Sequence, residues 1–146
     1  MAESFVVRQE TQIAAPQATV FAFLTDPDKL LRWMGTGAEM DSQPGGIYLL
    51  KNVAGSHTAR GTFREVVPVH RLAYSFGWDD RPGVPPGSSL VEIDLIERDG
   101  GTLVRMTHSG LPTEEERAGH AKGWQHYFER LAVVAPGGSV EPDKPW

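Results

Sequence analysis

The stretch EEERAGHAKGWQHYFERLA, residues 114–132, decides the fold, because it predicts one long helix near the end of the chain. Thr113 stands before it as an N-cap, and Glu116 follows three residues later in the pattern of a capping box. Gly119 and Gly123 lie inside this helix, and each glycine costs a helix interior about 0.8–1 kcal/mol relative to alanine. Either a close approach of the helix to its neighbour or space for a ligand would offset that cost.

The side of this helix that faces the protein interior follows from a rotation of about 100° per residue. The expected buried side contains His120, Ala121, Trp124, Tyr127, Phe128, Leu131 and Ala135. On the same count His126 faces water, Gly123 lies at the edge of the buried side, and Gly119 lies outside it. His120 and His126 are six residues apart, so they do not form a metal-binding pair of the i, i+4 kind.

The chain before this helix predicts a strand, two short helices and five or six further strands. The alternating residues 4–13 predict the first strand. Pro27 would break one long helix and Asp26 can cap a new one, so two helices are expected over residues 16–24 and 27–33. From Gly45 the hydrophobic period changes to two. The expected strands are 45–53, 58–67, 70–78, 89–97 and 101–109, with 36–41 as a further candidate.

Turn signals complete the expected order of elements. Residues 98–101, Arg-Asp-Gly-Gly, predict a tight hairpin, and the segment 79–89, with three prolines and two glycines, predicts a loop. A curved antiparallel sheet must bury one face, and the long helix is the large apolar element available to cover it. The expected fold is therefore α+β, a curved antiparallel sheet wrapped around the C-terminal helix. We expect one domain over residues 1–135 and a loose Pro/Gly-rich tail over 136–146.

Strand parity identifies the side chains that face the helix. Leu72, Tyr74, Phe76 and Trp78 share one face, opposite Ala73, Ser75 and Gly77, and Val104, Met106 and His108 share another strand face. Trp33, at the end of the second short helix, can lie over one mouth of the space. These side chains either pack as an ordinary core or line a ligand cavity. The candidate cavity residues are Trp33, Tyr74, Phe76, Trp78, Met106, His108, His120, Trp124, Tyr127 and Phe128.

Composition and motifs exclude several classes of protein. The formal net charge is −5 and no basic stripe is present, which argues against nucleic-acid binding. The chain has no cysteine, so disulfides, thiolate catalysis and cysteine-bound zinc are excluded. No nucleotide-binding, metalloprotease or serine-hydrolase motif occurs, and neither a metal nor a cofactor is expected. The sequence shows no signal peptide and no membrane span, so a cytoplasmic protein is expected.

Several segments, taken in order, resemble the activator of heat-shock protein 90 ATPase homologue branch of the bacterial START-like superfamily. This superfamily, also called SRPBCC, includes Bet v-like and polyketide-cyclase-like proteins. The matching segments are 13–35, 41–48, 61–76, 100–112 and 120–131, and the resemblance covers residues 5–135. The positions that fit the family pattern are Trp33, Gly46, Gly61, Pro68, Leu72, His108, Gly123 and Trp124. The resemblance implies a helix-grip fold, in which a seven-stranded sheet grips a C-terminal helix over a cavity and two short helices close it.

Three functions remain open on this basis. Members of the superfamily bind lipids, hormones or polyketides, which favours a protein that binds a small hydrophobic or aromatic molecule. The second possibility is a cyclase- or hydrolase-like enzyme with His108 or His120 as general acid or base. The third is a protein-interaction module that could act as a homodimer, with the loop 79–89 and the tail ending in Trp146 as contact surfaces. We do not expect the co-chaperone role, because the chain has no room for the second domain found in the eukaryotic protein.

Overall fold

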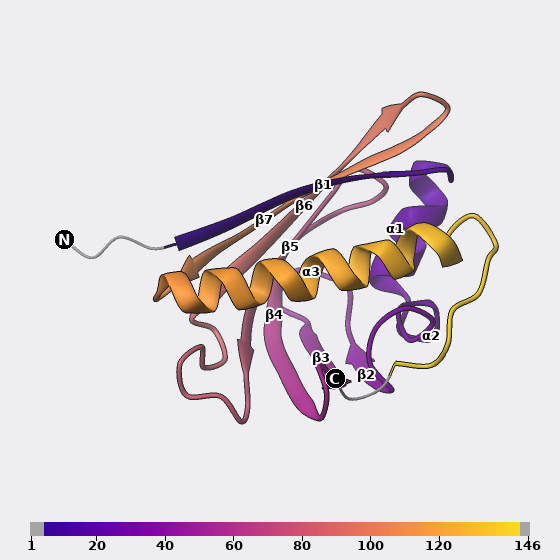
Figure 1. The fold of residues 1–146 in the computed structure, drawn as a ribbon. Coiled ribbons are helices and arrows are strands. Elements are labelled where there is room, and N and C mark those ends of the chain that lie inside the picture. Colours follow the sequence, from indigo (N-terminus) through magenta and orange to yellow (C-terminus); the bar gives the residue numbers. More distant parts are fainter. Residues whose placement is uncertain (1–4, 144–146) are drawn as a thin grey trace.

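A seven-stranded antiparallel sheet with one long helix across its face makes up most of the molecule, as a computed structural model of residues 5–143 shows (Figure 1). The strands are β1 (Phe5–Ile13), β2 (Gly37–Met40), β3 (Ile47–Val53), β4 (His57–Val67), β5 (Arg71–Trp78), β6 (Ser89–Arg98) and β7 (Gly101–Leu111). The helices are α1 (Gln17–Thr25), α2 (Pro27–Leu30) and α3 (Glu114–Val134). The predicted α+β helix-grip architecture is confirmed, including the candidate strand within residues 36–41.

The strand order of the sheet is β1-β7-β6-β5-β4-β3-β2, so each strand from β2 to β6 pairs with the next strand in the chain. β1 joins the sheet beside β7, which brings the beginning of the described chain next to its last strand. The predicted hairpin between β6 and β7 is present, with Asp99 and Gly100 both at positive φ. Positive φ at two central residues matches the right-handed twist of the flanking strands.

The long helix α3 begins where the capping residue predicted. The Thr113 hydroxyl oxygen accepts a hydrogen bond from the Glu116 amide at 3.1 Å. The expected buried side is also observed, because His120, Trp124, Tyr127, Phe128 and Leu131 are all buried. The second half of the capping box differs from the prediction, since the Glu116 carboxylate bonds to Arg81 in the loop after β5.

The two short helices pack at one end of the sheet (Figure 1). Asp26 caps α2 as predicted, and its carboxylate accepts from the Asp28 amide at 2.9 Å. The helix is shorter than expected and continues as hydrogen-bonded turns to Met34. This irregular end places Trp33 in the core, where its indole N–H donates to the Phe23 carbonyl oxygen at 3.0 Å.

Strand β5 is buried on both faces, although parity predicted one buried face. Leu72, Tyr74, Phe76 and Trp78 face the core, but Ala73 and Ser75 are buried as well. The loop after β5 folds back on the strand, and the Trp78 amide donates to the Val84 carbonyl oxygen at 2.7 Å. This return covers Gly77 on the second face, where a Cβ would lie 1.9 Å from the Pro85 carbonyl oxygen.

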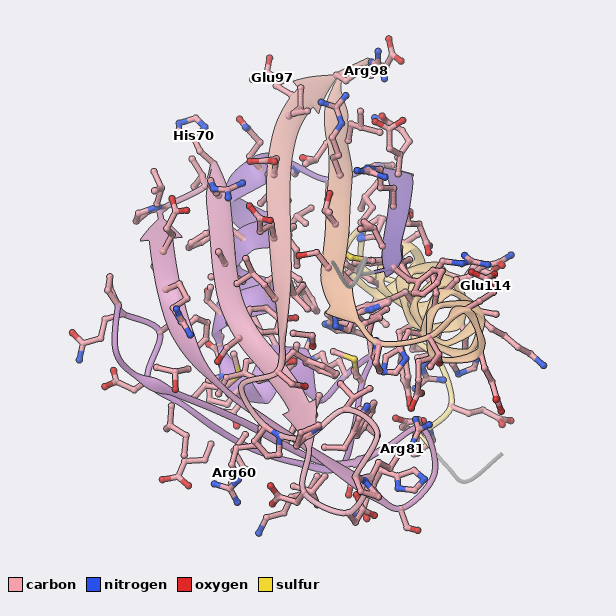
Figure 2. The ribbon with its side chains drawn as sticks, turned by 90° about the vertical axis from the view of Figure 1, so that its left-hand side faces the viewer. Arg60, His70, Arg81, Glu97, Arg98 and Glu114 are labelled. Atoms are coloured by element: carbon pink, nitrogen blue, oxygen red, sulfur yellow. The ribbon has the colours of Figure 1, made fainter. Side chains whose placement is uncertain are left out.

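The two ends of the sheet carry different groups (Figure 2). His70, Glu97 and Arg98 lie at the end where the β4–β5 and β6–β7 hairpins turn, whereas Arg60 and Arg81 lie toward the opposite end. Arg60 makes two hydrogen bonds to the Asp79 carboxylate, at 2.8 and 2.9 Å. The loop that carries Asp79 and Arg81 is therefore held to the sheet at the end near the start of α3.

Gly61 should not tolerate a side chain, because a Cβ at this position would lie 1.6 Å from the Ser75 carbonyl oxygen of β5. We expect Gly61→Ala to lower the free energy of unfolding by about 3 kcal/mol or more, since overpacking against backbone forces the strands apart. Gly37→Ala is the control, because its Cβ would meet only ordinary contacts of 3.5 Å and longer. Urea denaturation measures both variants, and equal stabilities would contradict this reading of the β4–β5 approach.

Candidate ligand cavity

A cavity of about 610 Å³ lies between α3 and the strands β3, β4 and β5. Its wall combines apolar and aromatic side chains with a small number of polar ones, a composition typical of small-molecule sites. The lining residues are Met34, Tyr48, Leu50, Val53, Ala54, His57, Phe76, Trp78, Arg81, Gly119, His120, Lys122, Gly123, Trp124, His126 and Tyr127. The cavity is therefore large enough for a ligand of several fused or linked rings.

Both glycines of α3 face this space. A Cβ built on Gly119 or on Gly123 would meet no atom within 4 Å, apart from its own helix and chain neighbours. The expectation that Gly119 and His126 lie outside the space is wrong, since both line the cavity. The predicted angles of these residues around the axis of α3 were correct. The cavity, however, lies along the flank of the helix, about 100° around that axis from Trp124. Close packing of the helix on the sheet does not explain these glycines.

Five of the ten candidate cavity residues line the cavity, and five lie behind it in the core. The lining members are Phe76, Trp78, His120, Trp124 and Tyr127, whereas Trp33, Tyr74, Met106, His108 and Phe128 are packed away from it. The packed group is tightly filled, as shown by the stacking of Phe128 on Trp33 and on Trp124. Large side chains thus occupy the space directly beneath α3, and the cavity remains at its side.

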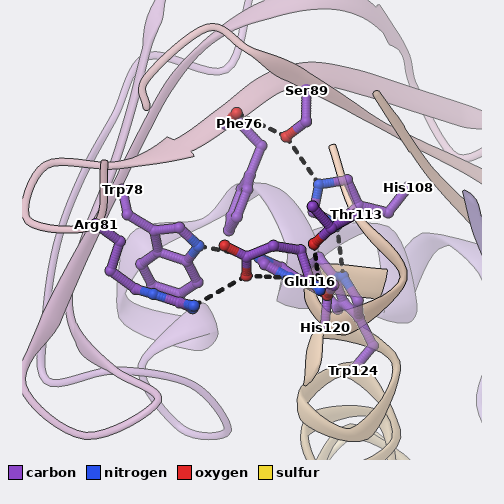
Figure 3. A network of polar contacts seen from close by, with 9 residues as sticks. All are labelled: Phe76, Trp78, Arg81, Ser89, His108, Thr113, Glu116, His120 and Trp124. Carbon is purple, nitrogen blue, oxygen red and sulfur yellow. Dashed lines mark hydrogen bonds and ion pairs between the residues drawn. The ribbon is translucent and has the colours of Figure 1, made fainter. Parts of the chain in front are cut away.

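Two tryptophan–histidine hydrogen bonds join α3 to the sheet beside the cavity (Figure 3). The Trp78 indole N–H donates to Nε2 of His120 at 3.0 Å. The Trp124 indole N–H donates to Nδ1 of His108, also at 3.0 Å. An indole N–H can only donate, so each of these ring nitrogens must be an unprotonated acceptor.

The remaining nitrogen of each imidazole is also engaged. Nδ1 of His120 donates to the Glu116 carbonyl oxygen at 2.7 Å. The Ser89 hydroxyl donates to the Phe76 carbonyl oxygen at 2.7 Å, so its oxygen accepts from Nε2 of His108 at 2.9 Å. The two rings are therefore neutral and in opposite tautomers. Neither has a free nitrogen with which to move a proton.

Burial favours the same neutral forms. Desolvation, reinforced by the nearby His120 ring, lowers the pKa of His108 to about 3. Desolvation also lowers the pKa of His120, although the Glu116 carbonyl and carboxylate act in the opposite direction. Both imidazoles thus remain uncharged at neutral pH, which suits a structural role in the wall of an apolar cavity.

Arg81 and Glu116 form a charged pair at the rim, next to these aromatic rings (Figure 3). Nη2 of Arg81 lies 2.9 Å from a carboxylate oxygen of Glu116, and the guanidinium lies 5.8 Å from the centre of the Trp78 ring. The same carboxylate lies 3.8 Å from Nδ1 of His120. The pair ties the loop after β5 to the first turn of α3 and so fixes one edge of the cavity.

The C-terminal tail is hydrogen-bonded to α3 next to the cavity, although the sequence suggested a loose segment. One carboxylate oxygen of Asp143 accepts from the Tyr127 hydroxyl at 2.7 Å and from the Gly35 amide at 2.7 Å. The Tyr127 oxygen in turn accepts from the Ala54 amide at 2.8 Å. Arg130 donates to the Glu141 carbonyl oxygen at 2.8 Å. Trp146, proposed from the sequence as a contact residue, lies outside the described residues.

Sequence reasoning did not find several lining residues. Tyr48 and Leu50 share one face of β3, but Ile47 and Leu49 are also apolar, so the strand has no alternation that would identify that face. Arg81 belongs to a loop, where no periodicity exists to be read. Lys122 is exposed and lies where the solvent side of α3 meets the cavity.

Two further properties concern the described part of the chain. Within residues 5–143, no group of three or more metal-binding side chains converges on a common point. None of the helices there has the length and hydropathy needed to cross a membrane.

A curved sheet that grips a C-terminal helix beside an aromatic-lined cavity defines a helix-grip domain. The sequence model of the family described as Activator of Hsp90 ATPase homolog 1-like protein matches residues 14–135. The chain therefore belongs to this family, as its resemblance predicted. No match was found among curated proteins.

Solved structures agree with this assignment. An AHSA1-like protein from Rhizobium etli, determined in solution, is 66% identical, with a TM-score of 0.78 over 98% of this chain and 90% of its own. A crystal structure from Chromobacterium violaceum is 25% identical, with a TM-score of 0.75 over 89% of this chain and 96% of its own. The Aha1 dimer from Colwellia psychrerythraea is 15% identical, with a TM-score of 0.80 over 93% and 99%. This last likeness shows the fold alone.

The stability of the protein should fall as the pH decreases from about 6.5 toward 3, in part because of His108. The unfolded chain binds a proton at this residue near its ordinary pKa, whereas the folded protein excludes it until about pH 3. The unfolded state then holds more protons, so His108 can remove up to about 1.4 kcal/mol of unfolding free energy per pH unit in this interval. His108→Leu should be less stable than the parent at pH 7, because it leaves the Trp124 indole N–H unpaired. Urea denaturation at several pH values should show that the difference in unfolding free energy between the parent and His108→Leu narrows in acid. A difference that stays constant with pH would contradict the lowered pKa of His108.

The two α3 glycines should accept alanine with a gain in stability. We expect Gly119→Ala and Gly123→Ala each to raise the free energy of unfolding by about 0.8–1 kcal/mol, because alanine favours the helix and its Cβ would enter open space. Thermal or urea unfolding measures the change. A loss of stability would show instead that the glycines permit close packing.

Proposed function

We propose that this protein binds a small hydrophobic or aromatic molecule in the cavity beside α3. The observation that carries the proposal is the combination of about 610 Å³ of space with an aromatic wall and two helical glycines that open onto it. Phe76, Trp78 and Trp124 offer ring surfaces, on which flat apolar ligands stack favourably. A helix that forgoes about 2 kcal/mol of propensity at Gly119 and Gly123 keeps this volume empty for an occupant.

Binding accounts for the site better than acid–base catalysis does. His108 and His120 were the candidate catalytic groups, yet both nitrogens of each ring are already hydrogen-bonded. Proton transfer by His120, the one that reaches the cavity, would first require the Trp78 bond to break. No observation favours an enzyme that uses either residue.

A protein-interaction role has less support than ligand binding. Among the described residues, the large hydrophobic side chains that are exposed are Val67 and Val133. A docking surface would require a larger contiguous apolar patch.

The remaining parts of the proposal are a single domain over residues 1–135, a cytoplasmic location, and assembly as a monomer or homodimer. The match of the family model to residues 14–135 supports the first of these.

Filling the cavity from Gly123 should abolish binding without harming the fold. We expect Gly123→Phe to weaken binding of the neutral aromatic probe N-phenyl-1-naphthylamine at least about tenfold, because the new ring occupies the space of the ligand. The probe's fluorescence on titration measures the affinity.

Ala118→Phe is the matched control, since Ala118 is an exposed residue of the same helix that does not line the cavity. It should bind the probe as the parent does, and both variants should unfold cooperatively. Unchanged binding by Gly123→Phe would exclude this cavity as the site. Native mass spectrometry of freshly purified protein would additionally identify any ligand retained from the cell.

A further inference from the structure

The cavity wall has a buried part and a part that meets solvent, and the two parts differ in the polar groups that they offer. The buried lining residues that carry an indole, imidazole or hydroxyl group are Tyr48, Trp78, His120, Trp124 and Tyr127. The partners of these polar atoms decide which ligand groups the buried wall can bind.

The indole and imidazole nitrogens of the buried wall are bonded to one another or to groups outside the cavity (Figure 3). The Trp78 N–H and Nε2 of His120 satisfy each other at 3.0 Å, and Nδ1 of His120 bonds to the Glu116 carbonyl oxygen. The Trp124 N–H bonds to His108, which does not line the cavity. The three lining rings therefore present apolar surface to a ligand and no free nitrogen.

The two tyrosine hydroxyls are not available to a ligand either. The Tyr127 hydroxyl donates to Asp143 and accepts from the Ala54 amide. The Tyr48 ring forms part of the wall, but its hydroxyl oxygen is enclosed by the protein and is out of reach from the cavity. Apart from Met34, the buried lining residues belong to β3, β5 and α3, whose backbones are hydrogen-bonded as strands and as a helix.

The polar groups of the lining that meet solvent form the mouth of the cavity. They belong to the half-buried or exposed residues His57, Arg81, Lys122 and His126. The Asp80 and Glu116 carboxylates bond to His57 and Arg81, so charges of both signs surround the mouth. A polar group of a ligand can remain hydrated there, whatever the sign of its charge.

A polar group carried past the mouth would lose its hydrogen bonds to water and find no side-chain partner in the buried wall. Such a loss is costly, because a buried donor or acceptor without a partner is strongly unfavourable. The orientation of a bound molecule is therefore determined by where its polar groups are, rather than by a specific hydrogen bond to the protein.

We infer that the cavity selects molecules with one bare end: an aromatic or hydrocarbon end without hydrogen-bonding groups enters the buried part, and any polar group stays at the mouth. This inference rests on the proposed function, because it specifies the ligand of the same site. It excludes as preferred occupants rigid molecules that carry hydroxyl, amide or carboxyl groups at both ends.

Three rod-shaped probes test this selection in the parent protein. Biphenyl has two bare ends, 4-hydroxybiphenyl has one, and 4,4′-dihydroxybiphenyl has none. We expect the first hydroxyl to change the affinity less than about threefold, and the second to weaken binding about tenfold or more, since it must be buried without a partner. General hydrophobicity would instead weaken binding by a similar factor at each step. Displacement of N-phenyl-1-naphthylamine, followed by its fluorescence, measures the affinities.

The Trp78–His120 pair allows the buried wall to be given a free polar group. Trp78→Phe removes the indole donor and leaves Nε2 of His120 as a free acceptor beside the cavity, whereas His120→Leu leaves the Trp78 N–H as a free donor. Each single variant should reduce the effect of the second hydroxyl to about threefold or less, because the buried hydroxyl then finds a partner. The double variant has neither group and should restore the loss of about tenfold.

Trp33→Phe is the matched control. It also breaks a buried indole hydrogen bond of 3.0 Å, to the Phe23 carbonyl oxygen, but Trp33 does not line the cavity. This variant should keep the discrimination of the parent against the second hydroxyl. Cooperative unfolding and binding of N-phenyl-1-naphthylamine establish that each variant is folded.

The outcomes distinguish the inference from the proposed function. If the two hydroxyls weaken binding to the parent by equal factors, or if neither single variant reduces the effect of the second, the inference is overturned while ligand binding stands. If the parent binds neither N-phenyl-1-naphthylamine nor biphenyl, the proposed function itself fails.

Discussion

The two indole-to-imidazole hydrogen bonds set the rotation of α3 on the sheet, and the rest of the site depends on that rotation. They run in opposite directions, from Trp78 of β5 to the helix and from Trp124 of the helix to His108 of β7. Turning α3 by one residue, about 100°, would move His120 and Trp124 out of reach of both partners. Apolar packing alone would tolerate a range of helix rotations, whereas buried directional bonds do not, because an unpaired indole or imidazole in the core is costly.

With the helix fixed in this rotation, the aromatic side of α3 fills the space beneath it and its flank remains open. Phe128 stacks between the rings of Trp33 and Trp124, with centroid separations of 6.0 and 5.4 Å. The cavity is therefore beside the helix, where Gly119 and Gly123 withdraw their side chains, and its far wall comes from β3 and the curled end of β5. The same polar pairs that stabilise the core thus decide which surface is left for a ligand.

Local periodicity predicted the parts of this structure that depend on neighbouring residues. The Thr113 cap, the turn at Asp99 and Gly100, and the buried side of α3 all follow from spacing within one element. The position of the cavity does not, because it depends on how strongly the sheet curls and on the loop that brings Arg81 to Glu116. An angular count centred on Trp124 places Gly119 outside the buried side of α3, and it contains no information on where β3 and β4 end and so on where the cavity lies. Tyr48 was not found for the same reason: the apolar run 47–50 indicates a buried strand, but not which space Tyr48 borders.

The contacts of Asp143 show that the packed structure extends beyond the segment that the family model matches. The family match ends at residue 135, yet Asp143 is the common acceptor for Tyr127 in α3 and for the Gly35 amide, 108 residues away in sequence. A chain that ended at residue 135 would keep every described strand and helix and lose this acceptor. The Tyr127 hydroxyl, which belongs to a cavity-lining residue, and the Gly35 amide would then have water in place of the Asp143 carboxylate. The chain end thus holds a side chain of the cavity lining in place, although it belongs to no helix or strand of the fold.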